Sequence, residues 1–286
     1  MKKHHLIITI LFIATQSLTA QWTKGKNKGY YKLSAWSLTA DQHYTDTGEI
    51  DPNATRGQFN VSFYGEYGIS NKIDIIAYIP FFARAYQNDQ ISGTTGATIQ
   101  KGEAINSVGD SDIGIRYAIL KRDNIAISTT LKLGIPIGED AGGSDKSFQT
   151  GDGEFNQLLQ ADLGIPFTIK NIPLYAKTFI GFNNRTEDFS DELHAGAEIG
   201  CSFLKQKIWL IGRFNTVQSL QNGSKSAQNS QGSIFANNIE YTSVGGEIAY
   251  YFTKKLGFSL TYTSAINGRI IYANPSISGG IFLDIK

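Results

Sequence analysis

The sequence has little cysteine, methionine or proline, and only one long apolar run. Its 286 residues include one cysteine, Cys201, one methionine and six prolines. A single cysteine excludes an intramolecular disulfide framework. Beyond the N-terminus, no apolar stretch approaches the roughly 18 residues that a membrane-spanning helix needs. If the chain lies in a membrane, it must therefore cross as strands.

An excess of charge of either sign is also lacking. The chain has 26 basic and 25 acidic residues, and removing Lys2 and Lys3 with the N-terminal segment leaves 24 basic against 25 acidic residues. A nucleic-acid partner would require a basic face, so none is expected.

The N-terminus resembles a secretory signal peptide. Lys2 and Lys3 give a positive start, residues 6–14 are apolar, and residues 17–20 are small or polar apart from Leu18. We expect residues 1–20 to be removed and residues 21–286 to form the exported chain. The alternative is an N-terminal anchor helix. No cysteine stands near position 20, so a lipoprotein is not expected.

Glycine and aromatic residues are abundant, and apolar residues alternate with polar ones. The chain has 30 Gly, 14 Tyr and 17 Phe. In "GDSDIGIRYAILKRDNIAISTTLKLGIPIGED" (109–140), a period of two runs through both halves of a hairpin. The same period predicts twelve strands, at residues 29–40, 57–68, 73–85, 108–120, 125–137, 154–166, 173–183, 192–203, 208–217, 239–252, 256–265 and 273–285.

The connections between these strands alternate in length. Five are tight, at residues 69–72, 121–124, 167–172, 204–207 and 253–255. The others are long and polar, at residues 41–56, 86–107, 138–153, 184–191, 218–238 and 266–272. A soluble sandwich with Greek-key crossovers would scatter the two kinds over both ends. The alternation instead predicts one all-β domain, an up-and-down antiparallel outer-membrane barrel with short periplasmic turns and long extracellular loops.

Each predicted strand has one face nearly free of charge. In the hairpin at 109–140 this face carries Ile113, Ile115, Tyr117 and Ile119, followed by Ile125, Ile127, Leu131 and Leu133. The opposite face carries Asp112, Arg116, Ser128 and Lys132. An Arg or Lys at mid-depth on the lipid face of a barrel costs about 2–4 kcal/mol. We therefore expect the isoleucines to face lipid and the charges to face the lumen.

The same sorting gives a set of charged residues that are candidates to line the lumen: Asp74, Arg84, Arg116, Lys132, Asp162, Lys177, His194, Glu198, Arg213 and Glu247. Tyr78, Tyr175 and Phe179 are placed on the same face. From the sixth strand onward the signs alternate, which predicts a ladder of ion pairs across neighbouring strands. One interpretation is a network that fixes the wall, and the other is a constriction that selects a permeant. The balanced signs predict no strong preference for anions or cations.

Motifs for catalysis and metal binding are weak. Beyond residue 20 the chain has two histidines, His43 and His194, so no zinc site of ordinary spacing is expected. A barrel phospholipase needs a His–Ser pair at the lipid face and a barrel protease needs Asp and His at the outer rim, and neither pattern is specific here. Asp140, Asp145 and Asp152 in the glycine-rich loop 138–155 allow calcium, although solvated turn aspartates explain them equally well. We expect no enzyme and no cofactor.

Several motifs resemble an outer-membrane barrel family named for the meta-cleavage pathway of phenol degradation. They are Gly109-Asp110, Leu131-Lys132, Pro136-Ile137-Gly138 and Thr150-Gly151-Asp152-Gly153, and residues 28–50 resemble relatives from Bacteroidetes. The resemblance implies a transporter of hydrophobic or aromatic compounds and no catalytic residues.

We therefore expect an outer-membrane channel of a Gram-negative bacterium, through which a small and partly apolar molecule passes passively. Its partners would be outer-membrane lipid, the permeant and the barrel-assembly machinery. The alternative is a barrel without transport, which either binds ligands through its long loops or is structural.

Overall fold

A computed structural model describes residues 23–226 and 232–286. In these residues the chain forms fifteen strands: β1 Gly29–Tyr44, β2 Ile50–Gly68, β3 Ile73–Gln87, β4 Gln90–Ile91, β5 Thr98–Gln100, β6 Glu103–Ser107, β7 Ser111–Arg122, β8 Ile125–Ile135, β9 Asn156–Ile169, β10 Ile172–Arg185, β11 Glu192–Phe203, β12 Ile208–Ser219, β13 Glu240–Tyr251, β14 Leu256–Arg269 and β15 Ser276–Ile285. Across the described ranges, no helix is both long enough and apolar enough to span a membrane.

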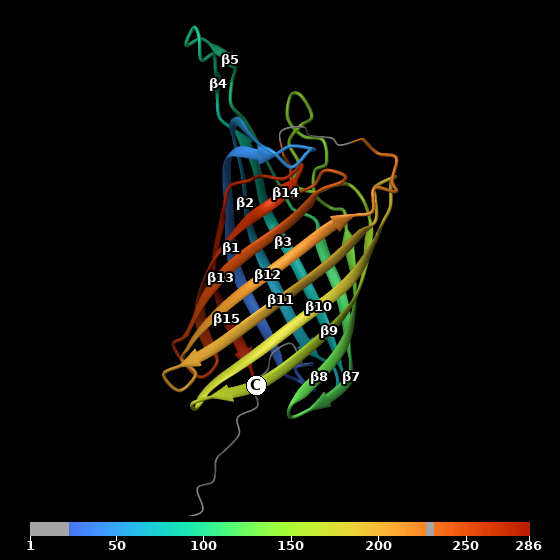
Figure 1. Cartoon of the computed structure of the whole chain (residues 1–286), viewed down its shortest axis with the longest axis vertical. Coiled ribbons are helices and arrows are strands. Elements are labelled where there is room, and N and C mark those ends of the chain that lie inside the picture. The colour runs from blue at the N-terminus through green and yellow to red at the C-terminus, as the bar shows by residue number, and fades with distance from the viewer. Residues whose placement is uncertain (1–22, 227–231) are drawn as a thin grey trace, which may run out of the picture.

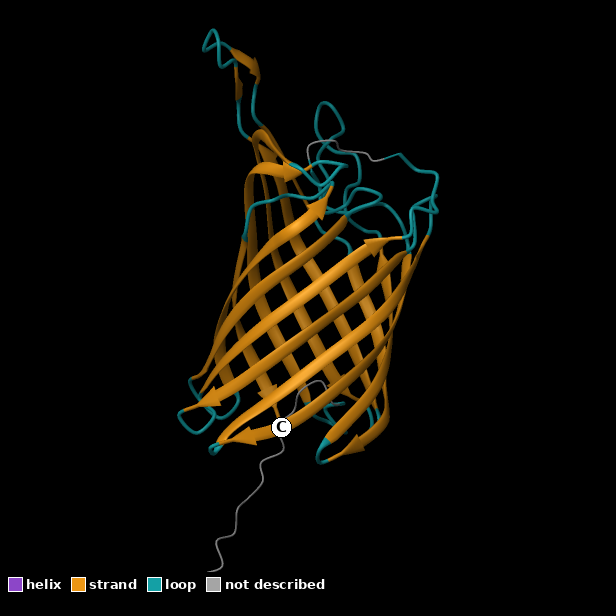
Figure 2. Cartoon of the chain, viewed as in Figure 1, coloured by secondary structure: helices purple, strands orange, loops and turns teal. Residues whose placement is uncertain are grey.

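The strands form a closed antiparallel barrel (Figures 1 and 2). Each strand pairs with its neighbours in chain order, and β15 closes the barrel on β1. β6 and β7 both pair with β3 and together occupy one position in the wall, so the described chain gives the twelve-stranded membrane barrel that the sequence predicts. β4 and β5 form a separate hairpin that projects beyond the loop rim.

The two rims differ as expected. Tight turns join β2 to β3, β7 to β8, β9 to β10, β11 to β12 and β13 to β14 at the periplasmic rim, and the long connections lie at the extracellular rim. One loop is shorter than predicted. β1 and β2 continue as a paired ribbon, so the predicted loop 41–56 shrinks to residues 45–49, where Thr45 N donates to Glu49 O at 2.8 Å.

The two faces of the wall are also as expected in the hairpin of β7 and β8. Ile113, Ile115 and Ile119 are exposed on the outside, with Ile115 57% exposed, while Arg116 and Ser128 are buried on the inside. In a membrane barrel this apolar outer face meets the hydrocarbon of the lipid.

In β3 the predicted faces are wrong beyond Phe81. The pairing with β2 jumps from Phe63–Ile79 to Val61–Phe82, which leaves an extra residue in β3 at Pro80–Phe81. Proline has no N–H to donate to the ladder, so a bulge is accommodated there. The bulge exchanges the two faces: Ala83 and Ala85 are buried inside, and Arg84 turns outward.

Candidate functional site

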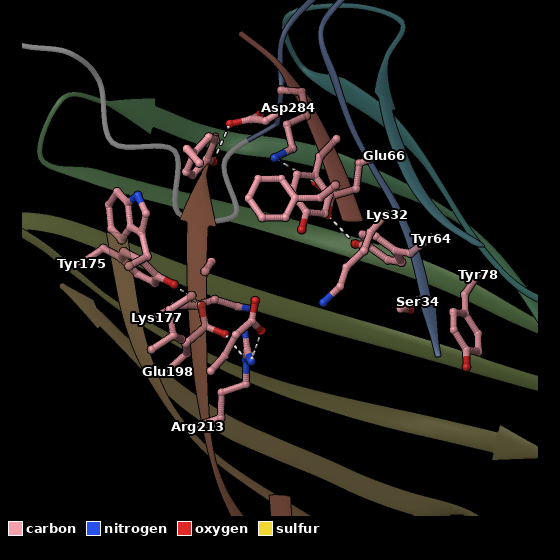
Figure 3. A pocket seen from close by; sticks show the side chains of 18 of the residues that line it. Lys32, Ser34, Tyr64, Glu66, Tyr78, Tyr175, Lys177, Glu198, Arg213 and Asp284 are labelled. Atoms are coloured by element: carbon pink, nitrogen blue, oxygen red, sulfur yellow. Dashed lines mark hydrogen bonds and ion pairs between the residues drawn. The ribbon is translucent and has the colours of Figure 1, made fainter. Parts of the chain in front are cut away.

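The lumen contains a cavity of about 550 Å³ in its periplasmic half (Figure 3). Side chains from β1, β2, β3, β10, β11, β12, β13 and β15 line it. They include Tyr78, Tyr175 and Phe179, three of the aromatic residues that the sequence places on the inner face. Four of the predicted charges line this cavity: Lys177, Glu198, Arg213 and Glu247.

An ion cluster lies on the cavity wall around Arg213. Its Nε donates to Glu198 Oε2 and its Nη1 to Glu247 Oε2, both at 2.6 Å. The Tyr175 hydroxyl donates to Glu198 Oε1 at 2.6 Å. The Arg213 side chain keeps 30% of its surface exposed, so the cluster faces the cavity. This part of the predicted ladder forms because β11, β12 and β13 bring the three residues to nearly the same level.

The rest of the predicted ladder does not form ion pairs. Lys177 is opposite Glu198 in the strand register but makes no ion pair with any residue in the described parts of the chain. Asp162 is buried and accepts from Gln160 Nε2 at 2.6 Å and from the Thr130 hydroxyl at 3.3 Å. Asp162 is opposite Phe179 rather than Lys177 in the register, so these two charges are offset by two residues. Glu198 is level with Lys177 but is already bound by Arg213 and Tyr175.

Arg116 belongs to a second, buried cluster near the periplasmic rim. Its Nη1 lies 3.2 Å from Glu66 Oε1 and 3.9 Å from Asp74 Oδ2. The Tyr64 hydroxyl donates to Glu66 Oε1 at 2.5 Å. Arg116 is 3% exposed and Asp74 is fully buried, so this cluster is part of the wall.

The chain preceding β1 completes this buried cluster. The backbone N–H of Lys24 donates to both carboxylate oxygens of Asp74, at 2.8 and 3.1 Å, and Lys24 Nζ lies 3.3 Å from Glu66. Lys121 Nζ donates to Thr23 O at 2.6 Å. Residues 23–28 therefore lie against the periplasmic ends of β2, β3 and β7. The alternation of residues in β2 predicts that Glu66 faces inward, whereas no sequence pattern predicts the position of Lys24.

The remaining predicted charges lie away from the cavity. Lys132 pairs with Asp112 at 3.2 Å, and His194 Nε2 lies 2.9 Å from Glu192 Oε2. Arg84 does not line the lumen, because the bulge at Pro80 turns it outward, where it donates to Asn106 at 3.0 Å. Lys32 also lines the cavity. The prediction from the sequence did not include it, although the alternation of residues in β1 places it on the inner face.

The extracellular half of the lumen is closed by loop residues, which we call the lid (residues 136–155 and 233–239). Gln58 Nε2 in the wall donates to Gln149 O at 3.2 Å, and the Arg56 guanidinium lies over the Phe148 ring at 5.7 Å. Ser233 Oγ donates to Gln149 Oε1 at 3.3 Å. The space left among these residues is about 10 Å³, no more than one water occupies.

Arg185 fastens the lid to the wall. It lies 2.9 Å from Asp152, 2.7 Å from Glu154 and 2.9 Å from Glu192. Its guanidinium also stacks over the Phe189 ring at 4.2 Å. Burial and the neighbouring charge of Glu154 raise the pKa of Asp152 to about 8. One cation thus contacts three acidic side chains, and Asp152 is the one whose pKa is raised.

The three aspartates of loop 138–155 make separate contacts. Asp145 accepts from Ser147 N at 2.9 Å, Asp152 pairs with Arg185, and Asp140 lies beside Gly153. Within residues 23–226 and 232–286, no group of three or more acidic, histidine or cysteine side chains is arranged to hold a metal ion. Calcium binding by this loop stays a prediction from the sequence.

Comparison with known proteins identifies the fold. No family model matches the sequence, and no curated protein matches it. The chain is similar to the COG4313 outer membrane channel from Pseudomonas putida F1, with a TM-score of 0.60 and 12% identity over 93% of this chain and 99% of that one. Weaker matches are a KdgM porin in complex with disordered oligogalacturonate (TM-score 0.49, 6% identity, 90% and 99% covered) and LpxR from Salmonella typhimurium (0.49, 10%, 90% and 100%). At these identities the likeness concerns the outer-membrane barrel fold.

Proposed function

We propose that this protein is an outer-membrane channel through which a small, partly apolar molecule diffuses passively. The observation that supports the proposal is the cavity of about 550 Å³, which aromatic side chains line together with the Arg213 cluster. Side chains fill the interior of barrels of about eight strands, whereas this twelve-stranded barrel is wider and keeps an open, lined space. We infer further that the chain is exported with its signal peptide removed and is inserted by the barrel-assembly machinery of a Gram-negative bacterium, consistent with the resemblance to the phenol meta-pathway family and to Bacteroidetes relatives.

The lid gives the structure the geometry of a closed state. Phe148 and Gln149 are buried inside the extracellular mouth, and the pocket between them and the wall is about 10 Å³. Passage therefore requires the lid to move. The lid contacts the wall through side chains rather than through a hydrogen-bonded sheet, so it can rearrange without opening the barrel wall.

The proposal is that of a channel without catalytic activity. His194 faces the lumen and is bound to Glu192, so it cannot serve a lipid-facing catalytic pair. His43, at the outer rim, is 4% exposed and packs within the mouth. These placements support transport over either type of barrel enzyme.

A barrel that binds ligands at the cell surface is the second candidate. The observation that favours it is the hairpin of β4 and β5, which extends beyond the rim and exposes Ile91 and Ile99, the latter by 71%. The two isoleucines lie on the strands of this hairpin, next to its polar tip at residues 92–97, and give the hairpin an apolar surface.

Single-channel recording in a planar bilayer tests the channel. Folded protein is first identified on a gel by different mobilities before and after boiling. We expect discrete current steps from the folded protein, and larger ones when the lid is shortened. Folded protein that passes no current even with a shortened lid would exclude the channel and favour the surface barrel.

A further inference from the structure

The acidic side chains of the cavity already have their donors. Glu198 accepts from Arg213 and Tyr175, and Glu247 accepts from Arg213 and from Thr261 at 3.2 Å. Nearer the rim, Glu66 is held by the buried cluster, and Asp284 accepts from the Tyr251 hydroxyl at 3.0 Å. A cationic ligand would have to displace one of these bonds in order to reach a carboxylate.

Two lysines of the cavity are in the opposite situation. Lys32 on β1 and Lys177 on β10 both line the cavity, and neither forms an ion pair or hydrogen bond with another residue of the described chain. Lys177 Nζ lies 5.9 Å from the centre of the Phe179 ring. In Figure 3 the Lys32 amine extends into the cavity from the wall opposite Lys177. Two ammonium groups with three donors each are thus available to a ligand.

The lining of the cavity also has more cationic than acidic side chains. Five cations (Lys24, Lys32, Lys177, Arg213 and Lys286) face the cavity against four acids (Glu66, Glu198, Glu247 and Asp284). One of the two free lysines offsets the second carboxylate bound to Arg213, and the other is not offset. The lining side chains therefore sum to one excess positive charge, although the whole chain is nearly neutral.

The walls beside the lysines are aromatic. On one side Tyr30 stacks on Phe282 with ring centres 5.6 Å apart, and Tyr251 meets Phe282 edge-on at 4.9 Å. On the other side Tyr175 and Trp209 lie 5.8 Å apart. Such walls favour a flat apolar body.

We infer that this cavity binds a small organic anion, namely a carboxylate on a planar or aromatic body. The carboxylate would lie between Lys32 and Lys177, and the body would lie against the aromatic walls. The volume of about 550 Å³ falls within the range of small-molecule sites. This inference rests on the proposed channel and adds the charge of its permeant. A nearly neutral lumen and a local anion site are compatible, because the site depends on which charges are already paired.

Calorimetry on the detergent-solubilised full barrel tests the site with benzoate, benzamide and benzylammonium as probes. The three share a ring and differ in charge. We expect benzoate to bind roughly tenfold more tightly than benzamide, because charge-assisted hydrogen bonds are added, and benzylammonium to bind most weakly. Equal affinity for benzoate and benzamide, or tighter binding of benzylammonium, would overturn the inference.

Variants locate the site. We expect Lys32→Gln and Lys177→Gln each to weaken benzoate binding by roughly tenfold without changing benzamide binding, since each removes one charged donor. Lys177→Arg should restore most of the affinity. Lys132→Gln is the matched control, because Lys132 pairs with Asp112 outside the cavity. Folding of each variant is checked by the gel shift on boiling. A folded Lys32→Gln/Lys177→Gln double variant with undiminished benzoate affinity would refute the site.

Recordings in a bilayer separate this inference from the proposed function. Benzoate binding by a folded barrel that passes no current would exclude the channel and leave the site intact. Current through a barrel whose affinity for benzoate does not exceed its affinity for benzamide would keep the channel and exclude the anion site.

Discussion

The two halves of the lumen are filled to different extents. In the periplasmic half, inward side chains leave a cavity of about 550 Å³, whereas the pocket between the lid and the wall in the extracellular half is about 10 Å³. The wall is the same hydrogen-bonded sheet in both halves. The difference lies in the lid, which brings Phe148 and Gln149 into the mouth.

This difference teaches which contacts hold the barrel and which close it. The wall needs no contribution from the lumen, since every strand of the closed barrel has two partners. The open half can therefore keep partly exposed charges such as Arg213. The closed half instead depends on a few side-chain contacts, and the most heavily bonded of them is Arg185.

Removing the lid should have the largest effect. Replacing residues 142–149 with two glycines takes Phe148 and Gln149 out of the mouth, so we expect a severalfold rise in single-channel conductance. Shortening the β4–β5 hairpin at residues 92–97 is the control, because that hairpin projects away from the mouth (Figure 1). Unchanged current after lid replacement would show that the described lid residues do not close the lumen.

Loss of the ion pairs of Arg185 should have the second-largest effect. Arg185→Gln leaves Glu154, which is 1% exposed, and two further carboxylates without their cation. Removing one partner of a buried pair costs about 3–5 kcal/mol. We expect the folded band on a gel to disappear at a clearly lower temperature. Arg269→Gln, at a more exposed pair with Glu240, should cost about 1 kcal/mol or less. Equal effects of the two variants would contradict the role of Arg185.

The lid should also respond to pH through Asp152. Its pKa is raised from 3.8 to about 8 by burial first and by Glu154 second, so the closed lid binds this proton more tightly than an open lid does. Closure is then most stable below about pH 4, weakens as the pH rises toward 8, and changes no further above that. We expect the open fraction in single-channel records to rise across this window, and Asp152→Asn to flatten the dependence. An open fraction that falls with rising pH would contradict this assignment.

The smallest effect concerns ion selectivity. Arg213→Gln leaves Glu198 and Glu247 facing the cavity without their shared cation, so the reversal potential in a salt gradient should shift toward cation preference. Arg84→Gln should leave it unchanged, because Arg84 lies on the outer face. A shift in the Arg84 variant comparable to that of Arg213 would place Arg84 in the lumen after all.

Much of the fold followed from local patterns in the sequence. The period of two, together with the alternation of tight and long connections, predicts the twelve strands, the two rims and the two faces of the β7–β8 hairpin. These features depend on each strand's own residues, because lipid excludes charge from one face of every strand. The same parity rule placed Arg213, Glu198 and Glu247 inside.

The rest depends on how separate segments meet. One bulge at Pro80 exchanges the faces of β3, so Arg84 was misplaced. The strand register decides that Arg116 meets Glu66 and Asp74. Glu198 lies opposite Lys177 but is bound by Arg213 and Tyr175, so Lys177 has no carboxylate partner among the described residues.

The sequence by itself thus determined a membrane barrel and the side chains available to its interior. Only the tertiary structure decided that Arg185 fastens a lid over one mouth and that residues 23–28 lie against one side of the other rim. It also decided that Lys32 and Lys177, between aromatic walls, have no ion-pair partner among the described residues. The physical reason is that alternation is a property of single strands, whereas pairing depends on the levels at which distant strands and loops come together.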